Sequence, residues 1–348
     1  MTAQQFPGES DRFAPIRAES ERIRASPIRP ESAHQQTMNE ASYKAAGRKL
    51  MAKRHHLYWV PCAAHSLDLM MEDIGKDKHV HDLVSKAQII TTFIYGHNRI
   101  PHMMRECTDG HDIIRPGPTR FASQFIALES LHKFRHELDT LIDSSEYLAH
   151  VGTLREESRD VAHEISCLVS DHRFWDRILY YLKLIEPLVQ VLRMVDGEDK
   201  NDMGYLYEAM DKAKERLREK HPMAFQKWWR IIDARWESTL HHDLHVVGYF
   251  FNPRHQYSDS PHNDSEVLQG TINVISRLSR STDERIDAMM EIDRFKLKLD
   301  IYRDYDLREA VNRMSPGESW VMLDYKTGQR NPLARIAIRV LSQTTSSS

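Results

Sequence analysis

Two pairs of residues in this sequence could bind a metal ion: Cys62 with His65, and His241 with His245. Thiolate and imidazole groups are common zinc ligands, and two histidines four residues apart lie on one face of a helix. A structural zinc site needs four ligands, and nothing in the sequence brings these two pairs together. We therefore expect the four residues to pack or to form hydrogen bonds, and we expect no zinc at Cys62 and His65 and no other bound cofactor.

The adjacent residues Arg235 and Trp236 could bind nucleic acid. A guanidinium group can pair with a phosphate, and an indole ring can stack on an unpaired base. The alternative is structural, with a buried tryptophan and an arginine that caps a helix or forms an ion pair beside it. The sequence leaves both interpretations open.

An acidic segment carries Asp196, Glu198, Asp199 and Asp202. It lacks the twelve-residue alternation and the terminal bidentate glutamate of a calcium-binding EF-hand. We expect a loop that caps a helix over 201–220. The chain has only 13 glycines and no glycine-rich phosphate-binding motif.

Helices must position most of these residues, because apolar side chains recur at steps of three and four along the chain. The pattern predicts one helix directly after Cys62 and another with a kink at Pro187, which removes a backbone donor. Other helices are predicted at 41–51, 79–107, 119–142, 171–195, 222–234, 243–251, 264–280, 283–312 and 333–341.

Strands are scarce. The four apolar residues 57–60, ended by Pro61, predict one short buried strand. The pair Asn252-Pro253 and the polar run that follows it predict a loop over 252–264. The chain is therefore expected to be mainly α, with a small α/β fragment near residues 37–78.

The block Pro61-Cys62-Ala63-Ala64-His65, between the predicted strand and helix, resembles the Cys-x-x-His signature of hAT-type transposases. The resemblance is to a large plant group that carries a domain of unknown function. Further blocks resemble the same group in the same order, so that the similarity covers about residues 37–348. These blocks are 115–122, 195–210, 231–245 with the pair Arg235-Trp236, and 336–343.

The resemblance implies an RNase H-like α/β core that is interrupted by a large helical insertion domain. The chain would then hold remnants of that core beside the insertion. The expected divisions are a disordered or atypical leader at 1–36, a core remnant with the Cys-x-x-His motif at 37–78, the helical insertion at 79–312, and the truncated start of a C-terminal dimerisation segment at 313–348.

Active relatives use three carboxylates to hold two magnesium ions for phosphodiester cleavage and joining. Residues 1–36 show no strand with the first aspartate, and the third carboxylate is expected beyond Ser348. Met38 stands where the second is expected, and its thioether is a poor ligand for a hard cation. Glu40 could replace it only by a shift of register. We therefore expect no catalytic residue and no bound magnesium.

Composition gives little further support for nucleic-acid binding. The net charge is −3 and the isoelectric point is near 6.7, although residues 1–60 carry ten Lys and Arg against six Asp and Glu. Three widely spaced cysteines favour a reducing compartment. No apolar run approaches the roughly 18 residues that span a bilayer, so we expect no membrane partner.

The sequence thus predicts a catalytically inactive hAT transposase-derived protein that retains DNA binding or homodimerisation through its C-terminal segment. By resemblance it is nuclear, and otherwise intracellular. If that segment is cut after one helix, its Ile336, Ile338, Val340 and Leu341 would form an exposed apolar patch. One alternative is a domesticated nuclear module that binds DNA or regulatory partners. Another is a metal-dependent transposase or nuclease completed by a second subunit.

Overall fold

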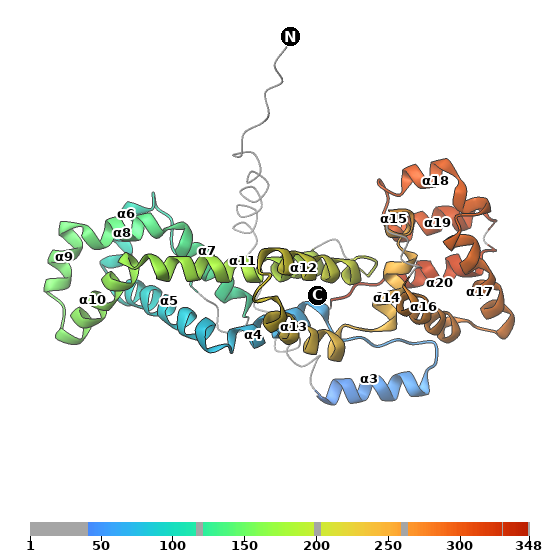
Figure 1. Ribbon diagram of the computed structural model, residues 1–348, viewed down its shortest axis with the longest axis horizontal. Helices are drawn as coiled ribbons and strands as arrows, with labels where there is room; N and C mark the ends of the chain where they lie inside the picture. The colour runs from blue at the N-terminus through green and yellow to red at the C-terminus, as the bar shows by residue number, and fades with distance from the viewer. Residues whose placement is uncertain (1–40, 116–120, 198–202, 259–263, 329, 347–348) are drawn as a thin grey trace, which may run out of the picture.

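In the computed structural model, residues 41–115, 121–197, 203–258, 264–328 and 330–346 are described. Every regular element within these ranges is helical, so the expectation of a mainly α fold is confirmed. The molecule is elongated (Figure 1), with α5–α10 at one end, α14–α20 at the other, and α4, α12 and α13 between them.

A first hydrophobic core runs from Cys62 to Leu240. The long helix α11 (His172–Val195) passes through it and contacts α4, α7 and α12. Pro187 lies inside α11, which is helical on both sides of it. The other helices of this lobe are α4 (Ala63–Gly75), α5 (Lys78–Gly96), α6 (Ile100–Cys107), α7 (Ala122–Lys133), α8 (Arg135–Asp143), α9 (Ser145–Gly152), α10 (Glu156–Ser170), α12 (Leu206–Lys220) and α13 (Phe225–Thr239).

A second hydrophobic core contains buried residues from Leu244 to Leu341. Met203, which precedes α12 in the sequence, also belongs to it. Its centre is aromatic: the ring of Trp320 meets those of Phe251 and Phe295, and its Nε1 donates to the carbonyl oxygen of Phe251 at 2.6 Å. The helices of this lobe are α14 (Asp243–Phe251), α15 (Pro253–Ser258), α16 (Ser265–Leu278), α17 (Thr282–Lys296), the 3-10 helix η3 (Asp300–Arg303), α18 (Tyr305–Ala310), α19 (Pro316–Lys326) and α20 (Pro332–Leu341).

The two cores divide the described residues near 241–243, inside the range 79–312 that the sequence assigned to one helical insertion. The RNase H-like character of 37–78 and the divisions at 78 and 312 stay predictions.

Residues near the two ends of the chain join the lobes. Helix α3 (Ala41–Lys53) is followed by an irregular segment that runs along the second lobe to α4. Arg277 of α16 donates to the carbonyl oxygens of Met51 at 2.7 Å and Leu57 at 3.0 Å. After α20 the chain returns to the first lobe, where the carbonyl of Thr345 accepts from the N–H of Ala63 at 2.9 Å.

The strand predicted over 57–60 is wrong. These four residues are half-buried and form neither helix nor strand. Tyr58 and Val60 pack against the second core, and the carbonyl of Leu57 accepts from Arg277. An extended segment becomes a strand only beside another one, and the described residues contain no strand for it to pair with.

Three long helices of the prediction are divided in the structure. Residues 79–107 separate into α5 and α6, and 119–142 into α7 and α8 at Phe134. The helix expected over 283–312 ends at Lys296, after which Lys298 and Asp300 adopt φ of 54° and 50°. The loop predicted over 252–264 contains α15 instead, because proline is well tolerated in the first turn of a helix.

The apolar residues of α20 do not form an exposed patch. Ile336, Val340 and Leu341 are buried and Ile338 is half-buried. Helix α20 packs against α14, α17 and α19 of its own chain, and Asn331 caps its first turn by accepting from the N–H of Ala334. The expected aggregation-prone surface is therefore covered by the second lobe.

Candidate nucleic-acid interface

Helix α4 carries the Cys-x-x-His motif and lies at the centre of the molecule. Its apolar face, with Leu67, Met70 and Ile74, is fully buried against α11 and α13. Cys62 precedes the first turn and is 5% exposed, so its thiol lies in the core. A buried thiol in apolar surroundings acts as a small hydrophobic side chain.

His65 lies one turn further along α4 and is half-buried. Desolvation lowers the pKa of His65 below its ordinary value, the charges of Arg235 and Lys44 lower it further, and Glu72 opposes them. The structure thus places His65 within the electric field of Arg235, although 170 positions separate the two motifs.

Arg235 of α13 is paired with an acidic residue of α4. Its Nε donates to Oδ2 of Asp73, and Oδ1 of the same carboxylate accepts from Nζ of Lys76 at 2.8 Å. Burial disfavours the ionised carboxylate, but these two hydrogen bonds outweigh it and lower the pKa of Asp73. A second ion pair joins α13 to the start of α5, since Lys227 of α13 lies 2.5 Å from Asp77, the N-cap residue of α5.

Trp236 is 8% exposed and belongs to the first core. Its ring stacks on His241 at 6.0 Å and lies 6.0 Å from the ring of Tyr207. Both members of the Arg-Trp motif therefore have structural partners within the chain. Their assignment to nucleic acid stays a prediction.

The pair His241 and His245 has partners of its own. Both ring nitrogens of His241 face carboxylates, Glu237 across 2.7 Å and Glu266 of α16. His245 is fully buried, and its Nδ1 lies 2.6 Å from the carbonyl oxygen of Leu240. Within the described ranges, no three His, Cys, Asp or Glu side chains are grouped so that they could hold a metal ion.

Asp68 is a site residue that the sequence reasoning missed. Its Oδ1 accepts from the N–H of Ala122 at 3.0 Å, at the start of α7. Desolvation raises the pKa of Asp68, while hydrogen bonds from the Ala122 and Phe121 backbone counteract it. The ring of Phe121 fills the space beside Gly75, where a methyl group would lie 2.1 Å away. No spacing in the sequence signalled this docking.

Several sequence-predicted features lie outside the described residues. Met38, Glu40 and the acidic residues Glu198, Asp199 and Asp202 are among them. Asp196 follows the last turn of α11, and α12 begins at Leu206 without a side-chain cap.

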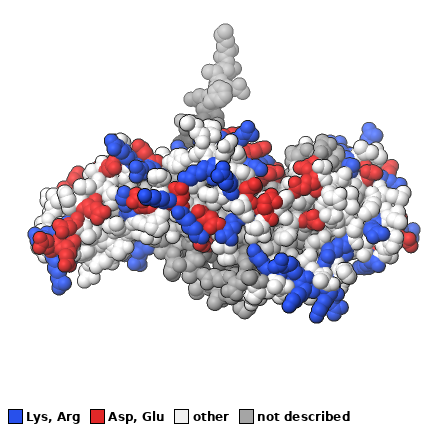
Figure 2. All heavy atoms as spheres, turned by 60° about the horizontal axis from the view of Figure 1, so that its bottom comes forward, with Lys and Arg blue, Asp and Glu red and all other residues white. Residues whose placement is uncertain are grey.

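The strongest charge feature adjoins α4. From residue 41 to residue 67 the chain carries five Lys and Arg and no Asp or Glu. Four of them, Arg48, Lys49, Lys53 and Arg54, are exposed, and Lys44 is half-buried. Lys and Arg side chains gather at the lower right of Figure 2, in the region that α3 occupies in Figure 1. The sequence contained this signal, but counting residues 1–60 together concealed it.

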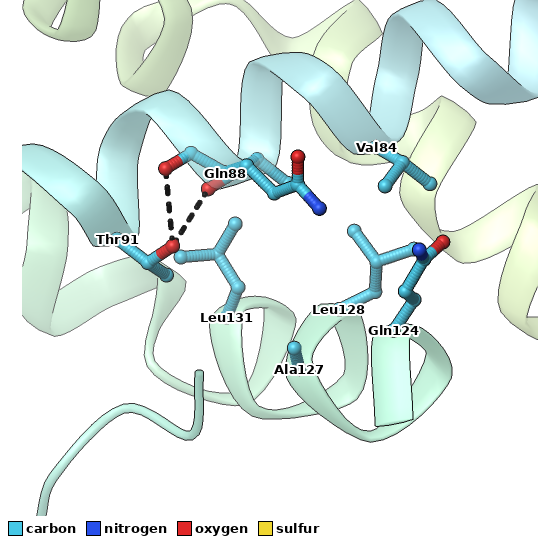
Figure 3. Close-up of a pocket in the computed structure, with 8 residues that line it drawn as sticks. Val84, Gln88, Thr91, Gln124, Ala127, Leu128 and Leu131 are labelled. Atoms are coloured by element: carbon cyan, nitrogen blue, oxygen red, sulfur yellow. Dashed lines mark hydrogen bonds between the residues drawn. The ribbon is translucent and has the colours of Figure 1, made fainter. Parts of the chain in front are cut away.

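Motif residues line neither of two cavities in the described part of the chain. Figure 3 shows the first, between α5 and α7, with space of only about 10 Å³ between Val84, Gln88 and Leu131. Thr91 at its edge donates back to the carbonyls of Ala87 and Gln88. That volume holds at most about one water molecule. An open groove of about 510 Å³ lies between α5 and α10.

Comparison with known families gives a match over part of the chain. Residues 36–90 match the family described as Domain of unknown function (DUF659). This domain is found in hAT-like transposase-related plant proteins, and the matched segment spans α3, α4 and most of α5. Neither the curated proteins nor the solved structures contain a match to the chain. No helix in the described part of the chain is both long and apolar enough to cross a membrane.

Proposed function

We propose that this chain is a catalytically inactive hAT transposase-derived protein that binds DNA. The observation that carries DNA binding is the cationic segment 41–67, which lies inside the DUF659 match and contains no acidic residue. Phosphate neutralisation by Lys and Arg supplies most of the affinity of non-specific DNA binding. An overall charge of −3 does not oppose such binding, because the contact is local.

The carboxylates of the matched segment support the absence of catalysis. Within residues 41–90 each Asp or Glu contacts a donor of the protein: Asp68 at α7, Glu72 with Lys76, Asp73 with Arg235, Asp77 with Lys227 and Asp82 with Lys86. Each of these carboxylates therefore already has a hydrogen-bond or ion-pair partner within the chain. Met38, where the family resemblance places a metal-binding aspartate, adds a further argument from the sequence.

Two measurements on the full chain test the proposal. Fluorescence anisotropy with duplex DNA should show binding at about 50 mM salt that weakens steeply by about 200 mM. Incubation of terminal-repeat DNA with the protein and Mg²⁺ or Mn²⁺ should give neither nicks nor joined products. Strand transfer would contradict the inactive assignment and favour a nuclease completed by a second subunit. Failure to bind at low salt would contradict DNA binding.

Nuclear location stays a separate prediction, which imaging of the tagged full chain in plant cells would test. A domesticated regulatory role would require binding to a defined DNA sequence or protein, whereas the cationic segment by itself accounts for sequence-independent contact with phosphates.

A further inference from the structure

We infer that the outward face of α3, with Arg54 directly after it, is the surface that contacts the phosphate backbone of duplex DNA, through Arg48, Lys49, Lys53 and Arg54. This inference rests on the proposed DNA-binding function and assigns it to one helix.

Helix α3 is attached to the molecule by a narrow face. Gly47 is buried against the indole ring of Trp59, so closely that a methyl group at Gly47 would lie 2.3 Å from the ring. Met51, four residues further on, is half-buried on the same side. Among the other residues from 42 to 53, all but the half-buried Lys44 are exposed.

The exposed face combines cations with small side chains. Successive residues of a helix are rotated by about 100°, which directs Arg48, Lys49 and Lys53 away from Gly47. Ala45 and Ala52 lie between them on that face and are exposed. Small residues beside the cations let the helix approach a charged surface closely, and the described residues show no acidic side chain paired with any of these cations.

Two arginine side chains hold the C-terminal end of α3 and the residues after it by donating to backbone carbonyl oxygens. Arg277 donates to the carbonyl of Met51, and Arg339 of α20 donates to the carbonyl of His56 at 2.7 Å. These two arginines fix α3 and Arg54 to the second lobe through backbone carbonyl oxygens, so the backbone that carries the cations is ordered. A surface that is already ordered loses less conformational entropy on binding.

The dimensions of α3 fit a duplex. The four cations lie within residues 48–54, which extend about 9 Å, a length over which B-form DNA carries about five phosphate charges. Four cations along this length can each find a phosphate without a fixed register. A lipid surface is a poorer fit, because insertion needs an apolar face and α3 exposes only Tyr43 and Leu50 among its large apolar residues.

The test compares two variants of the full chain that change the net charge equally. One carries Arg48→Gln, Lys49→Gln, Lys53→Gln and Arg54→Gln. The control carries Arg155→Gln, Arg159→Gln, Arg173→Gln and Arg177→Gln, four exposed arginines at the start and on the surface of α10 and α11. Circular dichroism and urea unfolding should show both variants folded, since all eight side chains are exposed.

Anisotropy with two duplexes of unrelated sequence gives the readout. We expect the α3 variant to bind at least about tenfold more weakly at about 50 mM salt, and its slope of log K against log salt to fall by about 3–4. The control should bind within about twofold of the unchanged protein. Both duplexes should behave alike, because phosphate contacts carry no sequence information.

The possible failures are distinguishable. If the unchanged protein binds DNA and the α3 variant binds equally well, the surface is wrongly assigned while the proposed function stands. If the unchanged protein does not bind, the proposed function fails as well. If phosphatidylserine-containing vesicles or polyglutamate bind through the same four residues as tightly as DNA, the assignment of α3 to a duplex is overturned.

Discussion

The guanidinium of Arg235 on α13 and the carboxylate of Asp73 on α4 form an ion pair, although the two residues are 162 positions apart in the sequence. The Cys-x-x-His helix and the Arg-Trp helix thus form one packed unit. This contact gives Arg235 a structural partner in the absence of any ligand.

We expect Arg235→Gln to lower the free energy of unfolding by about 1–2 kcal/mol, because Asp73 loses a charged hydrogen-bond donor at a partly covered position. The side chains are 33% and 22% exposed, so solvent screens part of the interaction. Urea denaturation and a double-mutant cycle with Asp73→Asn measure it. Lys86→Gln, which breaks an exposed pair with Asp82, serves as control and should cost less than about 0.5 kcal/mol. A coupling energy of zero in the cycle would refute the pairing.

His245 should make stability depend on pH. Burial lowers its pKa from 6.5 to about 4, and its Nε2 has no hydrogen-bond partner among the described residues. Because the folded-state pKa is depressed, the stabilisation is complete above pH 6.5 and is lost as the pH falls towards 4. The loss should reach about 3 kcal/mol.

Urea unfolding at several pH values tests this dependence. His245→Leu should flatten the curve across that window, whatever its effect at neutral pH. His136→Gln, at an exposed position of α8, should leave the curve unchanged. An equally steep curve for His245→Leu would show that other groups cause the dependence.

His241 should make stability depend on pH in the opposite direction to His245, with its contribution lost as the pH rises. Burial alone would lower its pKa, but Glu237 and Glu266 outweigh burial and raise it above 6.5. A raised folded-state pKa means that its contribution is complete below pH 6.5 and disappears as the pH rises through the folded value. Since Glu266 belongs to the second lobe, His241→Gln should reduce stability at pH 6 more than at pH 9. NMR titration of the imidazole gives the pKa directly, and a value below 6.5 would contradict this expectation.

Gly248 lies where α14 meets the segment that enters from the first lobe. A methyl group there would be 2.3 Å from the carbonyl oxygen of Met203. This oxygen belongs to the backbone, which cannot move aside as the end of a flexible side chain can. We expect Gly248→Ala to cost about 1–3 kcal/mol or more. Gly96→Ala, at the end of α5 with no atom within 4 Å, should be neutral or slightly stabilising. Equal thermal stabilities for both variants would exclude this close approach.

The C-terminal helix is expected to leave the protein monomeric. Leu333, Ile336 and Val340 are buried by α14, α17 and α19, so α20 presents no apolar face to a second copy. Light scattering at micromolar concentration should give a mass near 40.8 kDa. A mass near twice that value would restore the dimerisation predicted from the family resemblance and would require another surface or release of α20.

The sequence alone determined most helices, because burial of one helix face imposes a period of 3.6 residues that neighbouring positions reveal. Helix α14 begins and ends where the period predicted, and α11 and α20 deviate by one residue at their starts. The period could not predict the division at Phe134, since apolar residues continue at helical spacing through it. It also could not show that 57–60 lacks a neighbouring strand.

Only the tertiary structure decided which motifs meet. The sequence identified Cys62, His65, Arg235 and Trp236 as candidates, but it could not show that Arg235 reaches Asp73 or that His241 stacks on Trp236. Local spacing fixes which face of a helix is apolar, whereas the partner of that face depends on the shapes of all the elements that compete to cover it. For the same reason, the charge of α3 could be counted from the sequence, while its outward orientation depended on the packing of Gly47 against Trp59.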